Sequence, residues 1–148
     1  GSDALDSIER LHFTDLSVAF DLDGNAGQIA KLLGVMLGKD NWYDREFLGI
    51  GLDIVDNSDI SYVDLMGLAL NVLLGENPSN ETVFTFIFNN VVGAPPSQAD
   101  IDFYTALIDD GTFTQASLAA AAADHEINAE NIGLVGLISD GVEYFPVI

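Results

Sequence analysis

Hydrophobic positions along the chain form helical stripes that come in two runs of three. Within each stripe, apolar residues recur three and four positions apart, which is the period of a helix with one buried face. The stripes cover residues 28–37, 45–56, 62–70, 82–92, 98–109 and 115–124. The pattern predicts a mainly α-helical domain.

The two runs of three helices align with each other in one register, with only a short length change in the first break. The aligned positions are Leu37-Gly38 with Val92-Gly93, Val55-Asp56 with Ile108-Asp109, Ser61 with Thr114, Leu65 with Leu118, and Ala69 with Ala122. We interpret this register as an internal duplication of a three-helix unit, packed as one helical domain. The alternative is that any two amphipathic segments of this kind can be aligned by chance.

Residues suited to helix ends stand between the stripes. Hydroxyl and amide side chains are common N-caps, and glycine is common just after a helix. The expected N-caps are Ser61, Thr82, Ser97, Thr114 and Asn128, and the expected terminators are Gly38 and Gly93. Asn128 is expected to start a last helix that runs to Ile138.

The first 25 residues have a different pattern from the rest. Apolar and polar residues alternate over 8–13 and 17–22, which predicts a short β-hairpin with a turn at 14–16. Gly1 and Ser2 are interpreted as a cloning scar. The predicted organisation is a hairpin and an Asx-rich loop over 3–25, followed by a helical domain over 26–148. Within that domain the parts are repeat one at 26–75, repeat two at 81–124, and a C-terminal helix and apolar tail at 128–148.

Charge excludes several classes of partner. The chain has 24 acidic and 4 basic residues, for a net charge of −20, and nothing after Arg45 is Lys or Arg. Nucleic acid and anionic membrane surfaces both require a basic surface, so neither is expected as a partner. Apolar runs such as Ile132–Ile138 are far shorter than the ~20 residues of a membrane span. The chain has no cysteine, which excludes disulfides and thiolate metal sites.

One loop carries oxygen ligands at a spacing that suggests calcium. Asp21, Asp23 and Asn25 match the first three ligand positions of an EF-hand loop. The motif then fails, because Ala26 replaces its glycine and Leu32 replaces its bidentate glutamate. We keep these three residues as a candidate Ca²⁺ site, and Ca²⁺ as the one candidate cofactor. The alternative is a turn that caps the following helix.

Two inter-helix turns, 56–59 and 109–111, offer further carboxylates that could bind Ca²⁺, although ordinary turn chemistry explains both.

The sequence Asp124-His125-Glu126 resembles a catalytic site, because it places a histidine between two acids. Consecutive helical residues point in different directions, however, so these three are not expected to converge on one substrate atom. No catalytic residue is predicted. Of the functions considered for this chain, a hydrolase of extracellular polymers that uses these three residues is the least favoured.

Trp42 and Tyr43 lie in the loop where the two repeats differ in length. They are a candidate contact for a protein or carbohydrate partner. The alternative is that the rings fold back over the core.

The N-terminal run from Ile8 to Asp15 and the run from Val18 to Gln28 together resemble a helical module of bacterial secreted proteins. That module occurs in RTX-type (type I secreted, Ca²⁺-binding) and S-layer-like proteins, and has no assigned reaction. The segments 47–52, 89–93 and 131–144 resemble it as well, so the similarity spans residues 6–148. The glycine-rich nonapeptide repeats of RTX proteins are absent, so their Ca²⁺-driven folding does not transfer to this chain.

The resemblance implies a location and a context. We expect a secreted or cell-surface, non-catalytic C-terminal module that serves type I export, attachment or assembly. Its partners would be other domains of the same parent protein, secretion machinery or a surface partner. A dedicated calcium-binding domain is the alternative. A secretion signal would lie in the tail, at Tyr144, Phe145, Val147 and Ile148.

Overall fold

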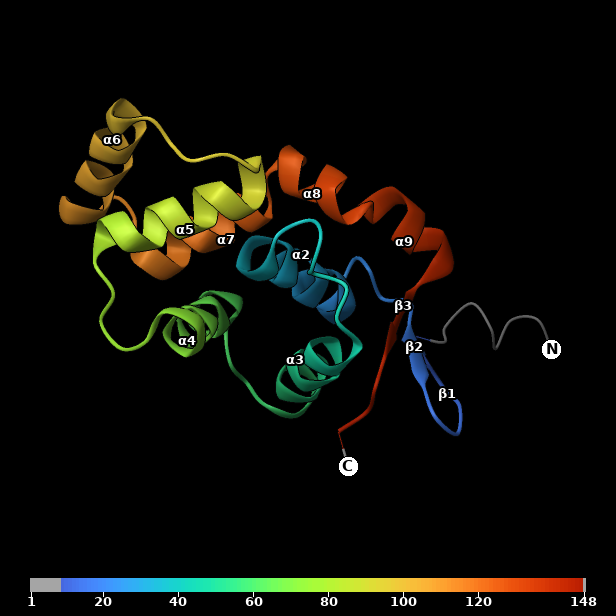
Figure 1. The fold of residues 1–148 in the computed structure, drawn as a ribbon. Coiled ribbons are helices and arrows are strands. Elements are labelled where there is room, and N and C mark those ends of the chain that lie inside the picture. Colours follow the sequence, from blue (N-terminus) through green and yellow to red (C-terminus); the bar gives the residue numbers. More distant parts are fainter. Residues whose placement is uncertain (1–8, 148) are drawn as a thin grey trace.

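The computed structural model describes residues 9–147, and this part of the chain is mainly helical with a small β-sheet (Figure 1). The helices are α2 (Asn25–Leu37), α3 (Arg45–Asn57), α4 (Tyr62–Leu74), α5 (Asn80–Val92), α6 (Gln98–Asp109), α7 (Gln115–Ala123), α8 (Glu126–Ile132) and α9 (Leu134–Asp140). The strands are β1 (Arg10–His12), β2 (Ser17–Ala19) and β3 (Val142–Tyr144). The predicted fold class, a mainly α domain with a short N-terminal hairpin, is confirmed.

Most predicted helix ends are also confirmed. The side chains of Ser61, Ser97 and Thr114 each accept the backbone N–H three residues further on, as N-caps do. Gly38 and Gly93 end α2 and α5 with positive φ angles of 81° and 83°. A positive φ is open to glycine at little cost, so these two positions stop their helices locally.

Two predicted caps are wrong. The cap of α5 is Ser79, whose hydroxyl accepts the N–H of Thr82, so Thr82 lies inside the first turn. Asn128 lies inside α8, and His125 is the residue that caps this helix. The expected single helix from 128 to 138 is two short helices, because Gly133 takes the left-handed conformation and ends α8.

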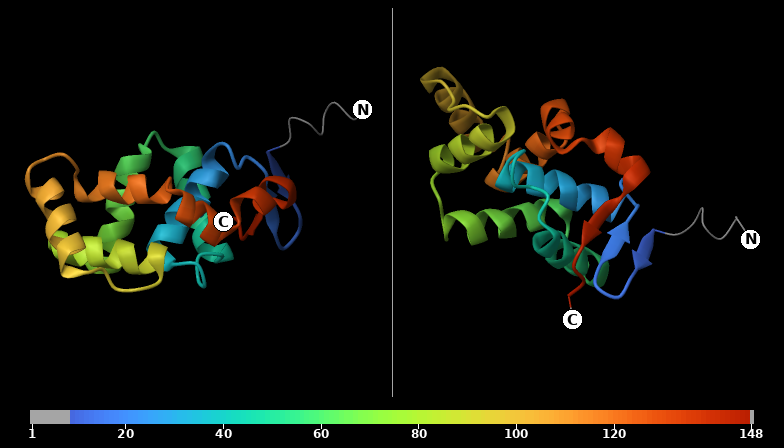
Figure 2. Two further views of the ribbon diagram at one scale, coloured as in Figure 1. Left: turned by 90° about the horizontal axis from the view of Figure 1, so that it is seen from above. Right: turned by 45° about the vertical axis from the view of Figure 1, so that its right-hand side comes forward.

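Helix α2 is the centre of the core. It packs against α3, α4, α5, α7 and α8 (Figures 1 and 2). Because neighbours cover it on several sides, its apolar residues Ile29, Ala30, Val35 and Met36 are almost fully buried. Burial on this scale is the main stabilising term of a small domain.

The C-terminal tail completes the sheet. Strand β3 pairs antiparallel with β2, and the order is β1-β2-β3, with Ser17 opposite Tyr144. After β3 the chain crosses α3 at Gly49, where a Cβ would overlap the carbonyl oxygen of Phe145. The N–H of Phe145 donates to the carbonyl of Arg45 at 2.9 Å. The hairpin is therefore held by the other end of the chain, which a lone hairpin needs.

Helices α2 and α5 each pack on the two helices that follow them in the chain, α2 on α3 and α4, and α5 on α6 and α7. The same relation of first helix to second and third is what a duplicated unit would show, while the duplication itself stays a prediction. No helix of the described residues has the length and apolar character needed to cross a bilayer.

Candidate functional site

An apolar groove (the first groove) lies between α3 and α4, and α2 forms its floor. Its volume is about 270 Å³. The floor is made by Ile29, Leu32, Leu33, Met36 and Leu37. Every residue that lines this first groove is apolar, so the site offers no side-chain donor or acceptor to a ligand.

The walls of the first groove expose large apolar side chains to solvent. Val72 is 74% exposed and Leu68 is 45% exposed on α4, while Phe47 is 47% exposed on α3. Of these three residues, Phe47 lies on a helical stripe that the sequence pattern assigned to a buried face. Exposed apolar side chains that gather around a groove, in place of being scattered singly, mark an interaction surface.

Carboxylates flank these exposed apolar residues. On α3, Glu46 and Asp53 lie one helical turn before and after Ile50, which lines the groove. On α4, Asp64 lies one turn before Leu68. None of these three carboxylates is in an ion pair within residues 9–147. The first groove is therefore apolar inside and negatively charged at its edges.

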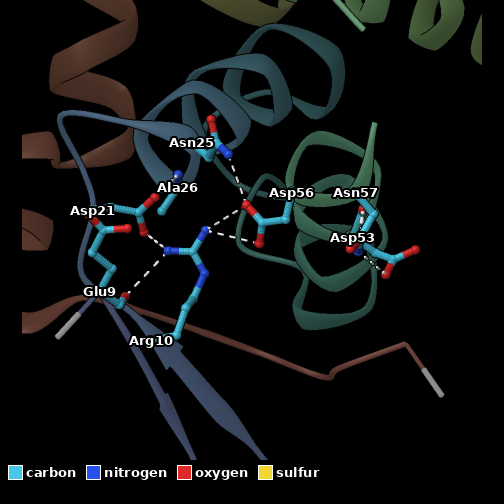
Figure 3. A network of polar contacts seen from close by, with 8 residues as sticks. All are labelled: Glu9, Arg10, Asp21, Asn25, Ala26, Asp53, Asp56 and Asn57. Carbon is cyan, nitrogen blue, oxygen red and sulfur yellow. Dashed lines mark hydrogen bonds and ion pairs between the residues drawn. The ribbon is translucent and has the colours of Figure 1, made fainter. Parts of the chain in front are cut away.

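Two of the three predicted calcium ligands, Asp21 and Asn25, lie in a network that already contains a cation, Arg10 of β1 (Figure 3). The Arg10 guanidinium pairs with the carboxylate of Asp21. It also donates to both oxygens of Asp56 on α3, at 3.1 and 3.2 Å. Asn25 donates to Asp56 at 2.8 Å, and the second oxygen of Asp21 accepts the N–H of Ala26 at 3.2 Å.

This network joins β1, the first turn of α2 and the end of α3. Asp21 is 9% exposed, so its charge requires a partner, and Arg10 supplies one. Asp23 lies on the surface. No group of three or more His, Asp or Glu side chains in the described part of the chain is placed to hold a metal ion. Calcium binding at Asp21, Asp23 and Asn25 stays a prediction.

Arg10 is the residue of this network that the sequence reasoning missed. The sequence feature that could have identified it is its rarity, because it is one of four basic residues and lies within the strand-like run 8–13. Nothing local connects it to Asp56, which is 46 residues away in the chain.

The other acidic turns use their side chains locally. Asp110 accepts from the N–H and the hydroxyl of Thr112, at 2.8 and 2.6 Å. The hydrogen bond from the Thr112 hydroxyl, and to a smaller extent the one from its N–H, lowers the pKa of the Asp110 carboxyl below its ordinary value. Asp109 accepts from the side-chain amide of Asn80 at 2.7 Å, which ties the end of α6 to the start of α5.

The acidic triplet around His125 serves the end of α7 and the start of α8. Nδ1 of His125 accepts the N–H of Ile127 at 3.2 Å, and Asp124 pairs with Lys31 of α2 at 3.4 Å. Burial of the Tyr62 hydroxyl raises its pKa well above its ordinary value, and the nearby negative charge of Asp124 raises it further.

The predicted partner contacts, Trp42 and Tyr43, have different surroundings. Trp42 is 6% exposed and belongs to the core, so its ring is not available to a partner. Tyr43 is 43% exposed, and its hydroxyl accepts the N–H of Glu143 at 2.8 Å. The sequence could not show which of the two rings is buried, because the residues are adjacent in one loop.

The predicted secretion tail is partly structural. Tyr144 is buried in β3, whereas Phe145 and Val147 are about half exposed. Ile148 lies outside the described residues.

Comparison of the chain with protein-family models, with curated proteins and with solved structures found no match.

Proposed function

We propose that this chain is a non-catalytic interaction module of a secreted or cell-surface bacterial protein, serving attachment or assembly. Through the first groove it binds a helical segment of a partner protein. That segment carries an apolar stripe flanked by lysine and arginine. The observation that carries the proposal is the apolar groove with carboxylates at its edges.

The lining of the groove favours protein side chains over a small molecule. Small-molecule sites combine apolar walls with a few polar groups that fix the ligand's orientation, and their volumes are about 300–1,000 Å³. The first groove has no such polar side chain and a volume of about 270 Å³. A row of aliphatic side chains from a partner fits a site that is apolar throughout.

The shape of the site favours a helix as the occupant. Helices α3 and α4 both pack on α2, and the groove runs between them. A fourth helix laid between α3 and α4 would cover exposed residues of both walls, Phe47 and Leu68 among them. This is helix-in-groove recognition, in which side chains three and four positions apart enter the groove.

Charge selects among possible helical partners. A second copy of this chain would bring another −20 to the interface, and that repulsion opposes self-association. A segment with lysine or arginine beside its apolar stripe would instead meet Glu46, Asp53 and Asp64. Complementary charge of this kind speeds encounter and selects the correct partner.

A location outside the cell is supported by composition and by the resemblance to secreted bacterial modules. The chain is strongly acidic and has neither cysteine nor a basic residue after Arg45. The non-catalytic part of the proposal is supported by the local roles of two residues: Asp124 pairs with Lys31, and His125 caps α8.

The proposal is tested with a synthetic helical peptide of about 18 residues, long enough for stable helix formation. It carries leucine at helical stripe positions and lysine elsewhere, and a matched peptide carries glutamate in place of lysine. Binding to the whole chain is measured by calorimetry. We expect the lysine peptide to bind and the glutamate peptide to fail.

Two variants locate the binding. Leu68→Glu puts a carboxylate into the apolar contact, and this should weaken binding by about tenfold or more, because the charge would be buried without a partner. Val135→Glu is the matched control, since Val135 is 84% exposed on α9 and away from the groove. It adds the same charge and should leave affinity unchanged. Equal binding of both peptides, or an unaffected Leu68→Glu variant, would refute the proposal.

A further inference from the structure

We propose that a groove lined mainly by α5 and α7, with Tyr104 of α6 and Ile127 of α8, is a second groove equivalent to the first, and that the chain is a bivalent receptor for basic amphipathic helices. The second groove has a volume of about 400 Å³. This inference rests on the proposed function, because it assigns the same class of ligand to both sites. It adds a second binding site and a stoichiometry.

The floors of the two grooves use equivalent positions of the two repeats. On α2 the positions are Ile29, Leu32, Leu33, Met36 and Leu37. On α5 they are Phe84, Ile87, Phe88, Val91 and Val92. The register that aligns Gly38 with Gly93 pairs these residues one to one, in this order. That register comes from helix ends in the sequence, whereas the grooves come from the packing of side chains.

The third helices contribute equivalent positions as well. On α4 the lining residues include Leu65, Leu68, Ala69 and Val72. In the register that aligns Ser61 with Thr114, their counterparts are Leu118, Ala121, Ala122 and His125, and all four line the second groove. The two grooves therefore share lining positions on α2 and α5 and on α4 and α7, with His125 just after α7 as the last of them.

The second groove differs in the size of its side chains. Its floor and wall include Phe84, Phe88 and Tyr104, and the rings of Phe84 and Tyr104 stack with centroids 4.7 Å apart. The opposite wall is smaller, because Ala121 replaces Leu68. We therefore expect the second groove to take larger apolar side chains than the first.

Charge around the second groove again favours a cationic ligand. All of its lining residues lie after residue 80, in a part of the chain that has no lysine or arginine. Asp100 lies one helical turn before Tyr104, and Glu126 follows His125, while Asp124 is paired with Lys31. A basic helix is therefore the occupant for both grooves. Two such helices on one partner would bind far more tightly than one.

The experiment counts binding sites with variants at equivalent positions. Leu68→Glu acts on the first groove and Ala121→Glu on the second, and both residues are exposed, so both variants should fold. The lysine–leucine peptide is titrated calorimetrically into wild type, both single variants, the double variant and Val135→Glu. We expect two peptides per wild-type chain, one per single variant, none for the double variant and two for Val135→Glu.

A second readout assigns each site without relying on heats. When the peptide is added to the Ala121→Glu variant, the methyl NMR signals of Leu32 and Leu33 should shift, because the first groove is intact. When it is added to the Leu68→Glu variant, the methyl signals of Ile87 and Leu118 in the second groove should shift. One peptide per wild-type chain that Leu68→Glu removes would overturn the second groove and leave the proposed function standing. Failure of wild type to bind the peptide would overturn both. Two peptides that neither variant affects would show that binding occurs elsewhere, which also overturns both.

Discussion

Asn128 on α8 fills the space that a side chain at Gly34 of α2 would need. A Cβ at Gly34 would lie 2.5 Å from Oδ1 of Asn128 and 2.8 Å from Cγ2 of Ile132. The Asn128 amide donates to the carbonyls of Lys31 and Ala123, at 3.0 and 2.9 Å. Three helices, α2, α7 and α8, therefore meet at one buried asparagine.

Replacing Gly34 should separate these helices. We expect Gly34→Ala to lower the free energy of unfolding by about 2–3 kcal/mol, because the methyl group must displace a buried, hydrogen-bonded side chain. Urea unfolding measures the change. The control is Gly136→Ala on α9, where a Cβ meets nothing within 4 Å. It should raise stability by up to about 1 kcal/mol, and a comparable loss in both variants would contradict the explanation.

Arg10 should matter more to stability than Arg45. Arg10→Met leaves the buried carboxylate of Asp21 without its cation, and we expect a loss of about 3 kcal/mol. Arg45→Met breaks a solvent-exposed pair with Glu143 and should cost less than about 1 kcal/mol. Chemical denaturation of the two variants side by side makes the comparison. Equal losses would mean that the buried network contributes no more than a surface pair.

Divalent ions should stabilise the chain without selectivity. With Arg10 already paired to Asp21, we expect Ca²⁺ and Mg²⁺ at matched ionic strength to raise the unfolding midpoint equally, by screening a net charge of −20. Thermal unfolding with each ion and with EDTA is the measurement. A rise specific to Ca²⁺ that Asp23→Ala removes would instead establish the predicted calcium site and make the calcium-binding alternative the better one.

Tyr62 should make the chain sensitive to alkali. Its folded pKa is raised by burial and by Asp124, so the folded state keeps a proton that the unfolded chain loses above about pH 10. This contribution to stability is fully present below about pH 10 and falls as the pH rises further.

Tyr62→Phe tests this directly. The Tyr62 hydroxyl is buried without a hydrogen-bond partner among the described residues. Its removal should raise stability by about 1 kcal/mol at neutral pH and flatten the loss above about pH 10. Unfolding midpoints of both proteins between neutral and alkaline pH supply the answer. A variant with lower stability at pH 7 would show that the hydroxyl has a partner.

Local signals in the sequence were enough to predict the helices. A cap such as Ser61 and a terminator such as Gly93 act on groups within one helical turn, and stripe periodicity reports which face a helix buries. These signals depend on neighbours three or four residues away. They failed at the start of α5, where Ser79 and not the predicted Thr82 is the cap, because the backbone conformation decides which of several nearby hydroxyl residues caps the helix.

Tertiary structure decided what the side chains do. Arg10 reaches Asp56, Tyr144 pairs with Ser17, and Asn128 bonds to Lys31, all across long stretches of chain. No local rule connects such residues, because chain folding alone brings them together. The loop of Asp21 therefore looked like a cation site from its ligands, and the structure gave it a cation from β1.

The grooves show both contributions at once. By itself, the sequence determined the apolar stripes and the register that aligns the two repeats, since both depend on spacing along the chain. Only packing decided that Phe47, on the stripe of α3, stays about half exposed, because α3 and α4 each pack on α2 and leave a groove between them. A stripe specifies an apolar face, and the positions of the other helices decide how much of that face is covered.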